Sequence, residues 1–71
     1  MPWYTRKSYA GRVGGVGVLT DVIRFEKPNN SQAIEHARAA AFVGGTTYAE
    51  LLDETDGFIC ELELPISGNA P

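Results

Sequence analysis

Two side chains in this 71-residue sequence, His36 and Cys60, have the chemistry of a base and a nucleophile. Cys60 lies in a stretch of alternating apolar residues, so we expect a buried thiol with a raised pKa. His36 lies off the apolar stripe of a predicted helix, near solvent, and no third group is placed to orient its ring. One histidine and one cysteine leave only carboxylates, without paired spacing, to bind a metal. We therefore predict that the protein is not an enzyme and holds no metal or cofactor.

A cluster of glycines at residues 11–17 invites comparison with phosphate-binding loops. A P-loop requires Gly-x-x-x-x-Gly-Lys-Ser/Thr between a strand and a helix, and no Lys-Ser/Thr pair closes this loop. Gly15-x-Gly17 lacks the third glycine of the dinucleotide-binding pattern, and a predicted strand follows it rather than a helix. The cluster therefore predicts a turn or a hairpin loop.

Charge is distributed unevenly along the sequence. The net charge is −3. Residues 1–30 contribute +3, from five Lys or Arg and two Asp or Glu, and residues 31–71 contribute −6, from one Arg and seven Asp or Glu. Residues 49–63 contain no Lys or Arg, and like charges opposed across a hairpin destabilise it. A cation from a neighbouring strand or from a partner is therefore expected near the carboxylates of this segment, which are Glu50, Asp53, Glu54, Asp56, Glu61 and Glu63.

Three explanations of this acidic segment remain open. Charge can keep an edge hairpin soluble and unpaired. Arg6, Lys7 or Arg24 can neutralise the carboxylates from an adjacent strand. A negative surface can also bind a basic surface of another protein, such as a nucleic-acid-binding groove. The paired carboxylates of a glycosidase need a cleft, for which so short a domain has little room.

Aromatic and cationic residues mix near the N-terminal end, as they do in proteins that bind single-stranded nucleic acid. Only Tyr4-x-Arg6 and Lys7-x-Tyr9 interleave in this way along a strand, and the net negative charge opposes a nonspecific grip on phosphates. We expect Trp3 or Tyr4 to pack in the core and predict no direct binding of nucleic acid.

Length and cysteine content restrict the class of protein further. Seventy-one residues form at most one small domain, which we place at residues 1–65, with a flexible tail at 66–71. No apolar run reaches the roughly 18 residues of a membrane span, and the first residues lack the apolar stretch of a signal peptide. The single cysteine cannot form an internal disulfide, so we expect a cytoplasmic protein.

The elements that must position these side chains are four strands and one helix. Aromatic and β-favouring residues predict a strand at 3–10, and a second strand at 16–26 is either central in the sheet or bulged near Gly17. A helix at about 32–42 has a stripe of small apolar residues that lets it lie close to a sheet. Asn30 or Ser31 is expected as its N-cap, and Gly44-Gly45 as its end. The stripe consists of Ala33, Ile34, Ala37, Ala40 and Ala41.

A hairpin closes the predicted fold. Strict alternation predicts a strand at 58–64 with Phe58, Cys60, Leu62 and Leu64 on its buried face, and 47–53 is its partner. Residues 54–57 read as a type I turn with Gly57 in the left-handed position. That turn pairs Asp53 with Phe58, Leu51 with Cys60 and Ala49 with Leu62. The other face then carries Tyr48, Glu50, Leu52, Ile59, Glu61 and Glu63. The order β-β-α-β-β predicts an α+β fold, an antiparallel sheet of about four strands with one helix on one face.

The sequence resembles two groups of short proteins. The start Met1-Pro2-Trp3-Tyr4, the alanine-rich helix and the run 52–58 leading into Leu62-Glu63-Leu64-Pro65 are similar to a family of short bacterial proteins of unknown function. Those proteins begin Met-Pro-x-Tyr and end in an Asp-x-x-Gly hairpin, whereas the glycine-rich loop and the acidic last strand depart from their pattern.

In size, order of elements and acidity, the chain also resembles small phage-encoded anti-CRISPR proteins. This resemblance implies a noncatalytic inhibitor that binds a type I CRISPR surveillance complex, in the cytoplasm of the host cell, and blocks its DNA site. We predict a partner-binding surface made of the acidic hairpin, and either a monomer or a homodimer. The alternative is a bacterial interaction module that forms homodimers through sheet edges or through an exposed Leu52/Ile59 pair. The predicted partner-binding residues are Tyr48, Glu50, Glu54, Asp56, Glu61 and Glu63.

Overall fold

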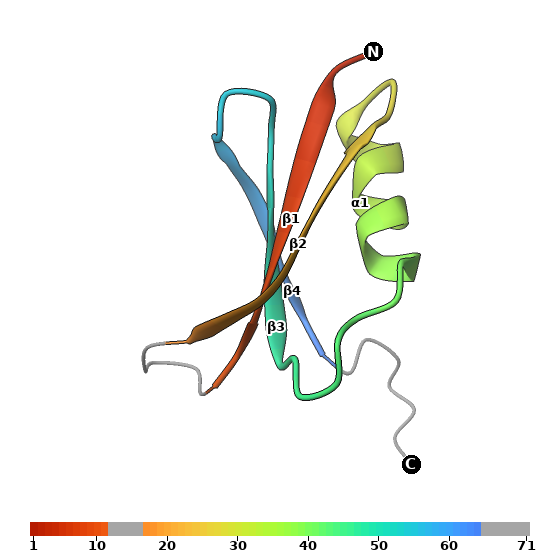
Figure 1. Cartoon of the computed structure of the whole chain (residues 1–71). Helices are drawn as coiled ribbons and strands as arrows, with labels where there is room; N and C mark the ends of the chain where they lie inside the picture. Colours follow the sequence, from red (N-terminus) through yellow and green to blue (C-terminus); the bar gives the residue numbers. More distant parts are fainter. Residues whose placement is uncertain (12–16, 65–71) are drawn as a thin grey trace.

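The elements occur in the order that the sequence predicts. A computed structural model of the chain describes residues 1–11 and 17–64, so residues 12–16 of the predicted loop at 11–17 and the predicted tail at 66–71 lie outside the described residues. The fold is α+β, a four-stranded antiparallel sheet with α1 against one of its faces (Figure 1). Its elements are β1 (Trp3–Ala10), β2 (Val18–Glu26), α1 (Asn30–Ala39), β3 (Tyr48–Leu52) and β4 (Phe58–Glu63).

The strand order of the sheet is β2-β1-β3-β4, which makes β2 and β4 the two edges. Of the two alternatives for the second strand, a central position is therefore wrong and a bulge is correct. The bulge lies at Thr20 rather than near Gly17, because Ser8 pairs with Asp21 while Tyr9 pairs with Leu19. Thr20 is the extra residue of this bulge, and its hydroxyl lies 2.9 Å from that of Thr46, in the segment before β3.

Helix α1 begins and ends earlier than predicted. Its N-cap is Asn29, not Asn30 or Ser31, and the Asn29 carboxamide oxygen accepts a hydrogen bond of 2.9 Å from the amide of Gln32. At the other end Ala40 is already extended, with φ −68° and ψ 142°, so the helix stops at Ala39 instead of about residue 42. The expected end at Gly44-Gly45 is wrong because a side chain from β1, Arg6, binds carbonyls at the end of α1.

The hairpin of β3 and β4 has the predicted register over most of its length. Leu51 pairs with Cys60, and Ala49 pairs with Leu62, as expected. The predicted pairing of Asp53 with Phe58 is wrong, because the register shifts next to Leu52, which pairs with Phe58. This bulge at the start of β4 leaves the Phe58 side chain 62% exposed, although the alternation placed it on the buried face. Ile59, expected on the other face, packs against the core instead.

The turn between β3 and β4 is held by the carboxylate of Asp53. Its Oδ1 accepts hydrogen bonds from the amides of Thr55 (2.9 Å) and Gly57 (2.7 Å) and from the Thr55 hydroxyl (2.9 Å). Asp56 has the left-handed conformation, with φ 67°, so the assignment of that position to Gly57 is wrong. Gly57 is required for space, since a Cβ there would lie 2.8 Å from Oδ2 of Asp53.

The core lies between α1 and the sheet face that it covers. Ala33 and Ala37 are fully buried, as the predicted stripe requires, whereas Ala41 is exposed because the helix has already ended. Tyr4 packs in this core, as expected, and its hydroxyl donates a 2.9 Å hydrogen bond to Asn30. The fully enclosed part of the core is small and consists of Tyr4, Ala33, Ala37, Ala49, Leu51 and Leu62.

Candidate binding surface

The face of the sheet opposite α1 is covered by no other element among residues 1–11 and 17–64 (Figure 1). Tyr4, Arg6 and Ser8 are buried on the side of the sheet that faces α1, so alternation along β1 directs Lys7 and Tyr9 to the uncovered face. The register extends this face across β3 and β4 in two rows. One row is Lys7, Glu50 and Glu61, and the other is Tyr9, Tyr48 and Glu63.

Carboxylates gather at the β3–β4 side of this face. Glu50 is half-buried between Lys7 on β1 and Glu61 on β4, and it lies directly opposite both in the register. Glu61 and Glu63 are exposed. We call Glu50, Glu61 and Glu63 the acidic face. The predicted opposition of Glu50 and Glu61 is thus present, and cross-strand pairs of like charge destabilise a sheet.

Of the three cations proposed to neutralise the acidic face, Lys7 is the one that lies beside it. Arg6 is fully buried on the other side of the sheet, where its guanidinium approaches Asp21 at 4.0 Å. Arg24 lies on the edge strand β2, with its guanidinium 5.3 Å from the Trp3 ring centre. The acidic face therefore has more negative charge than the neighbouring strand offsets.

Tyr48 and Tyr9 form an aromatic pair next to the acidic face. Their rings stack with centres 5.1 Å apart, and the Tyr9 hydroxyl donates to Oε1 of Glu50 at 3.5 Å. Burial raises the pKa of the Tyr9 phenol, and the negative charge and hydrogen bond of Glu50 raise it further. The position of the Tyr48 ring requires a glycine at residue 17, because a Cβ there would overlap the Tyr48 hydroxyl.

Two predicted partner-binding residues, Glu54 and Asp56, lie away from the acidic face. They are exposed in the turn between β3 and β4, at the opposite end of the hairpin from Tyr48 and Glu63. Oε1 of Glu54 accepts a 3.3 Å hydrogen bond from the Trp3 amide, which ties the turn to the start of β1. The fold therefore brings together four of the six predicted residues and leaves the two turn residues apart.

Apolar side chains on the uncovered face were missed or misplaced by alternation alone. Phe58 and Trp3 are 62% and 40% exposed, while Leu52 is only 8% exposed. The exposed Leu52/Ile59 pair proposed as a dimer contact is therefore wrong, since Leu52 is buried and Ile59 packs against the core. The bulge at the start of β4 is the cause, and strict alternation contains no signal for it.

The fold separates His36 and Cys60. Cys60 lines a groove between α1 and β4, where burial raises the pKa of its thiol and the charge of Arg38 acts in the opposite direction. His36 is half-buried rather than near solvent, with its ring centre 4.4 Å from that of Phe25. It lines a different groove, together with Gln32 and Glu35. A thiolate that is disfavoured and a histidine placed elsewhere do not form a nucleophile–base pair.

The aromatic–cation pairs near the N-terminal end divide between two faces. Tyr4 and Arg6 are buried beneath α1, whereas Lys7 and Tyr9 lie on the uncovered face. Within the described part of the chain, no three His, Cys, Asp or Glu side chains are grouped so that they could hold a metal ion. None of the described segments forms a helix with the length and hydropathy needed to cross a membrane. Comparison of the chain with protein-family models, curated proteins and solved structures finds no match.

Proposed function

We propose that this chain is a small noncatalytic binding protein whose acidic face covers a basic, nucleic-acid-binding surface of another protein. The observation that carries the proposal is the opposition of Glu50 and Glu61 on the uncovered face of the sheet. Such a pair lowers the stability of the free protein, and a basic partner removes that cost. Tyr48, stacked on Tyr9, supplies a rigid aromatic contact at the same place.

The resemblance to type I anti-CRISPR proteins suggests the partner. In this proposal the acidic face occupies the DNA-binding surface of a CRISPR surveillance complex, and the negative carboxylates take the place of phosphates. Glu54 and Asp56 add contacts only if the partner reaches beyond the sheet to the turn. Association depends strongly on charge, so affinity falls as salt rises.

Competition for DNA tests this function. A purified type I surveillance complex is titrated with the protein, and DNA binding is followed at about 50 and 200 mM salt, where charge-dependent binding differs strongly. We expect inhibition by the wild-type protein and none by the double variant Glu61→Lys, Glu63→Lys. A matched control, Glu26→Lys with Glu35→Lys, makes the same change in net charge on β2 and α1 and should inhibit normally.

Folding of each variant is verified by circular dichroism before the comparison. Inhibition by the Glu61→Lys, Glu63→Lys protein at the wild-type level would refute the role of the acidic face. Loss of inhibition in both double variants would show that only net charge matters, which also contradicts the proposal.

A homodimeric interaction module is the second candidate, and one observation favours it. Three apolar residues on the edge strand β2 are exposed: Val18 by 67%, Leu19 by 51% and Val22 by 44%. Exposed apolar side chains along a sheet edge favour self-association. Sedimentation of the wild-type protein and of a Val22→Lys variant tests this: a dimer that Val22→Lys dissociates supports it, and a concentrated monomer excludes it.

A further inference from the structure

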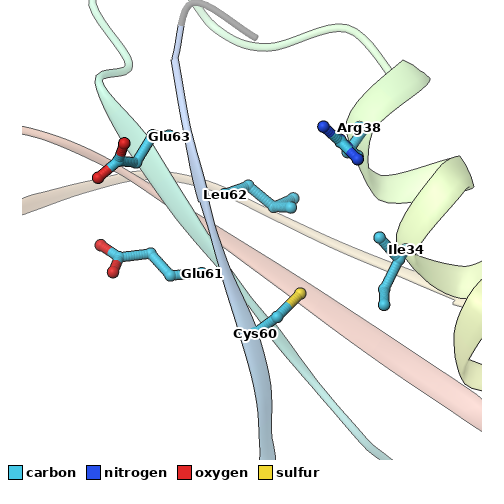
Figure 2. A pocket seen from close by; sticks show the side chains of 6 residues that line it. All are labelled: Ile34, Arg38, Cys60, Glu61, Leu62 and Glu63. Atoms are coloured by element: carbon cyan, nitrogen blue, oxygen red, sulfur yellow. The ribbon is translucent and has the colours of Figure 1, made fainter.

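A groove of about 470 Å³ runs between helix α1 and the outer edge of β4 (Figure 2). Ile34 and Arg38 line it from the helix, and Cys60, Glu61, Leu62 and Glu63 line it from the strand. β4 is the last strand in the sheet order, and within residues 1–11 and 17–64 it pairs with β3 alone. The groove therefore lies beside a strand edge that can accept another strand.

The backbone of β4 directs hydrogen-bonding groups toward this edge. The amide of Leu64 donates to the carbonyl of Thr47 at 3.1 Å, on the β3 side. In an antiparallel ladder the direction alternates from residue to residue, so Leu62 and Cys60 also bond toward β3. The N–H and C=O groups of Glu61 and Glu63 consequently face outward, and they form a row of donors and acceptors suited to an added strand.

Side chains along β4 alternate between the groove and the acidic face. Figure 2 shows Cys60 and Leu62 pointing toward Ile34 and Arg38, and the carboxylates of Glu61 and Glu63 pointing the other way. A strand added to this edge would continue the alternation. Residues beside Cys60 and Leu62 would lie in the groove and should be apolar. Residues beside Glu61 and Glu63 would lie next to carboxylates and should be basic.

The same charges argue against a second copy of this chain as the occupant. Pairing of two β4 edges would bring the Glu61 and Glu63 carboxylates of both copies together, and such like-charge contacts are how natural sheets prevent edge association. The carboxylates of Glu61 and Glu63 therefore disfavour pairing of this edge with a second copy of the chain and favour pairing with a strand of opposite charge.

We propose that the β4 edge binds an extended protein segment of alternating basic and apolar residues, which adds to the sheet as a fifth strand beside α1. This inference rests on the proposed function, because it specifies how a basic partner would meet the acidic face. Backbone hydrogen bonds to Glu61 and Glu63 hold the segment, its basic side chains pair with their carboxylates, and its apolar side chains fill the groove next to Ile34.

Synthetic peptides test the proposal. The probe is acetyl-Lys-Val-Lys-Val-Lys-Val-amide, titrated into the ¹⁵N-labelled protein and followed by NMR. We expect saturable shifts at the amides of residues 58–63 and at those of Ile34 and Arg38. A peptide in which glutamate replaces every lysine serves as the control for charge and should not bind.

Two isomers of the probe test edge pairing directly. One carries N-methyl groups on the lysines and the other on the valines, so composition and charge are identical. Only alternate residues of an added strand bond to the edge, so one isomer should bind about tenfold or more weakly than the other. Equal affinity of the two isomers, shifts confined to residues of β1 and β2, or no saturable shift would each overturn the proposal.

These outcomes are independent of the surveillance-complex assay. Inhibition of DNA binding together with equal affinity of the two methylated isomers would leave the proposed function and remove the fifth strand. Peptide binding at the β4 edge without inhibition of DNA binding would support the fifth strand and contradict the proposed function. A dimer of the free protein with protected amides at Glu61 and Glu63 would show that the edge pairs with itself and would also overturn the inference.

Discussion

The guanidinium of Arg6 lies 3.9 Å from the ring centre of Phe42, and both groups sit at the point where helix α1 ends. Nη1 of Arg6 donates to the carbonyls of Ala37 (2.9 Å) and Ala40 (3.0 Å), and Nη2 donates to that of Ala41 (2.9 Å). Carbonyls at the end of a helix lack partners within it, and a cation there also offsets the helix dipole. A fully buried arginine from the central strand β1 therefore determines where α1 stops.

Replacement of Arg6 should destabilise the protein strongly. Burial lowers the pKa of the Arg6 guanidinium and the Asp21 carboxylate raises it, but the group remains charged. Arg6→Ala leaves three carbonyls without their donors, so we expect a loss of about 3 kcal/mol or more in the free energy of unfolding. Arg6→Lys keeps the charge but lacks the planar fork of donors and should lose about 1–2 kcal/mol.

Urea unfolding measures both losses, and Lys7→Ala, at the next position of β1, is the control. Since Lys7 lies on the uncovered face, its replacement should change stability by less than about 1 kcal/mol. An Arg6→Ala protein as stable as Lys7→Ala would contradict this role of Arg6.

Asp53 should make the hairpin turn sensitive to acid. Hydrogen bonds from the Gly57 amide, the Thr55 hydroxyl and the Thr55 amide lower the pKa of its carboxyl group below the ordinary value. A carboxyl group whose pKa is lowered in the folded state stabilises the protein at pH values above its unfolded-state pKa of about 3.9. This stabilisation disappears as the pH falls through the folded-state pKa. The difference in unfolding free energy between wild type and Asp53→Asn should be constant near neutral pH and shrink below about pH 4. A difference independent of pH would be the contrary result.

Removal of the carboxylate opposite Glu50 should stabilise the free protein. Glu61→Gln ends the like-charge opposition without loss of a buried contact, because Glu61 is exposed. We expect a gain of about 0.2–1 kcal/mol at low salt, which diminishes as salt screens the charges. Thermal unfolding at two salt concentrations measures the gain, with Glu35→Gln on α1 as the control. Equal effects of the two substitutions would show that net charge, rather than the cross-strand pair, is responsible.

Cys60 should react slowly with alkylating reagents in the folded protein. Burial raises the pKa of its thiol, so little thiolate is present at about pH 8, and the half-buried sulfur is poorly accessible. Iodoacetamide labelling followed by mass spectrometry should be slow in buffer and fast in concentrated urea. Labelling at the same rate in both solutions would mean that the thiol is neither buried nor perturbed.

Periodicity in the sequence determined most of the elements and part of their pairing. The alternation of residues 58–64 and the turn before them predicted that Leu51 faces Cys60 and Ala49 faces Leu62, because side chains alternate along every strand. Small alanines predicted which side of α1 meets the sheet, and Ala33 and Ala37 are fully buried there. The opposition of Glu50 and Glu61 followed from the same register.

Tertiary structure alone decided the features that depend on residues far apart in the chain. Arg6 meets carbonyls 31 to 35 residues away, so no local pattern distinguishes it from a surface cation or places the end of α1 at Ala39. The bulge that exposes Phe58 lies next to the turn that Asp53 holds, and strict alternation of side chains does not predict an extra residue in a strand. Which strands form the edges depends on the packing of all four against one helix. The uncovered face, and the β4 edge that pairs with β3 alone among the described residues, are therefore products of the fold, whereas the charges that they carry were already in the sequence.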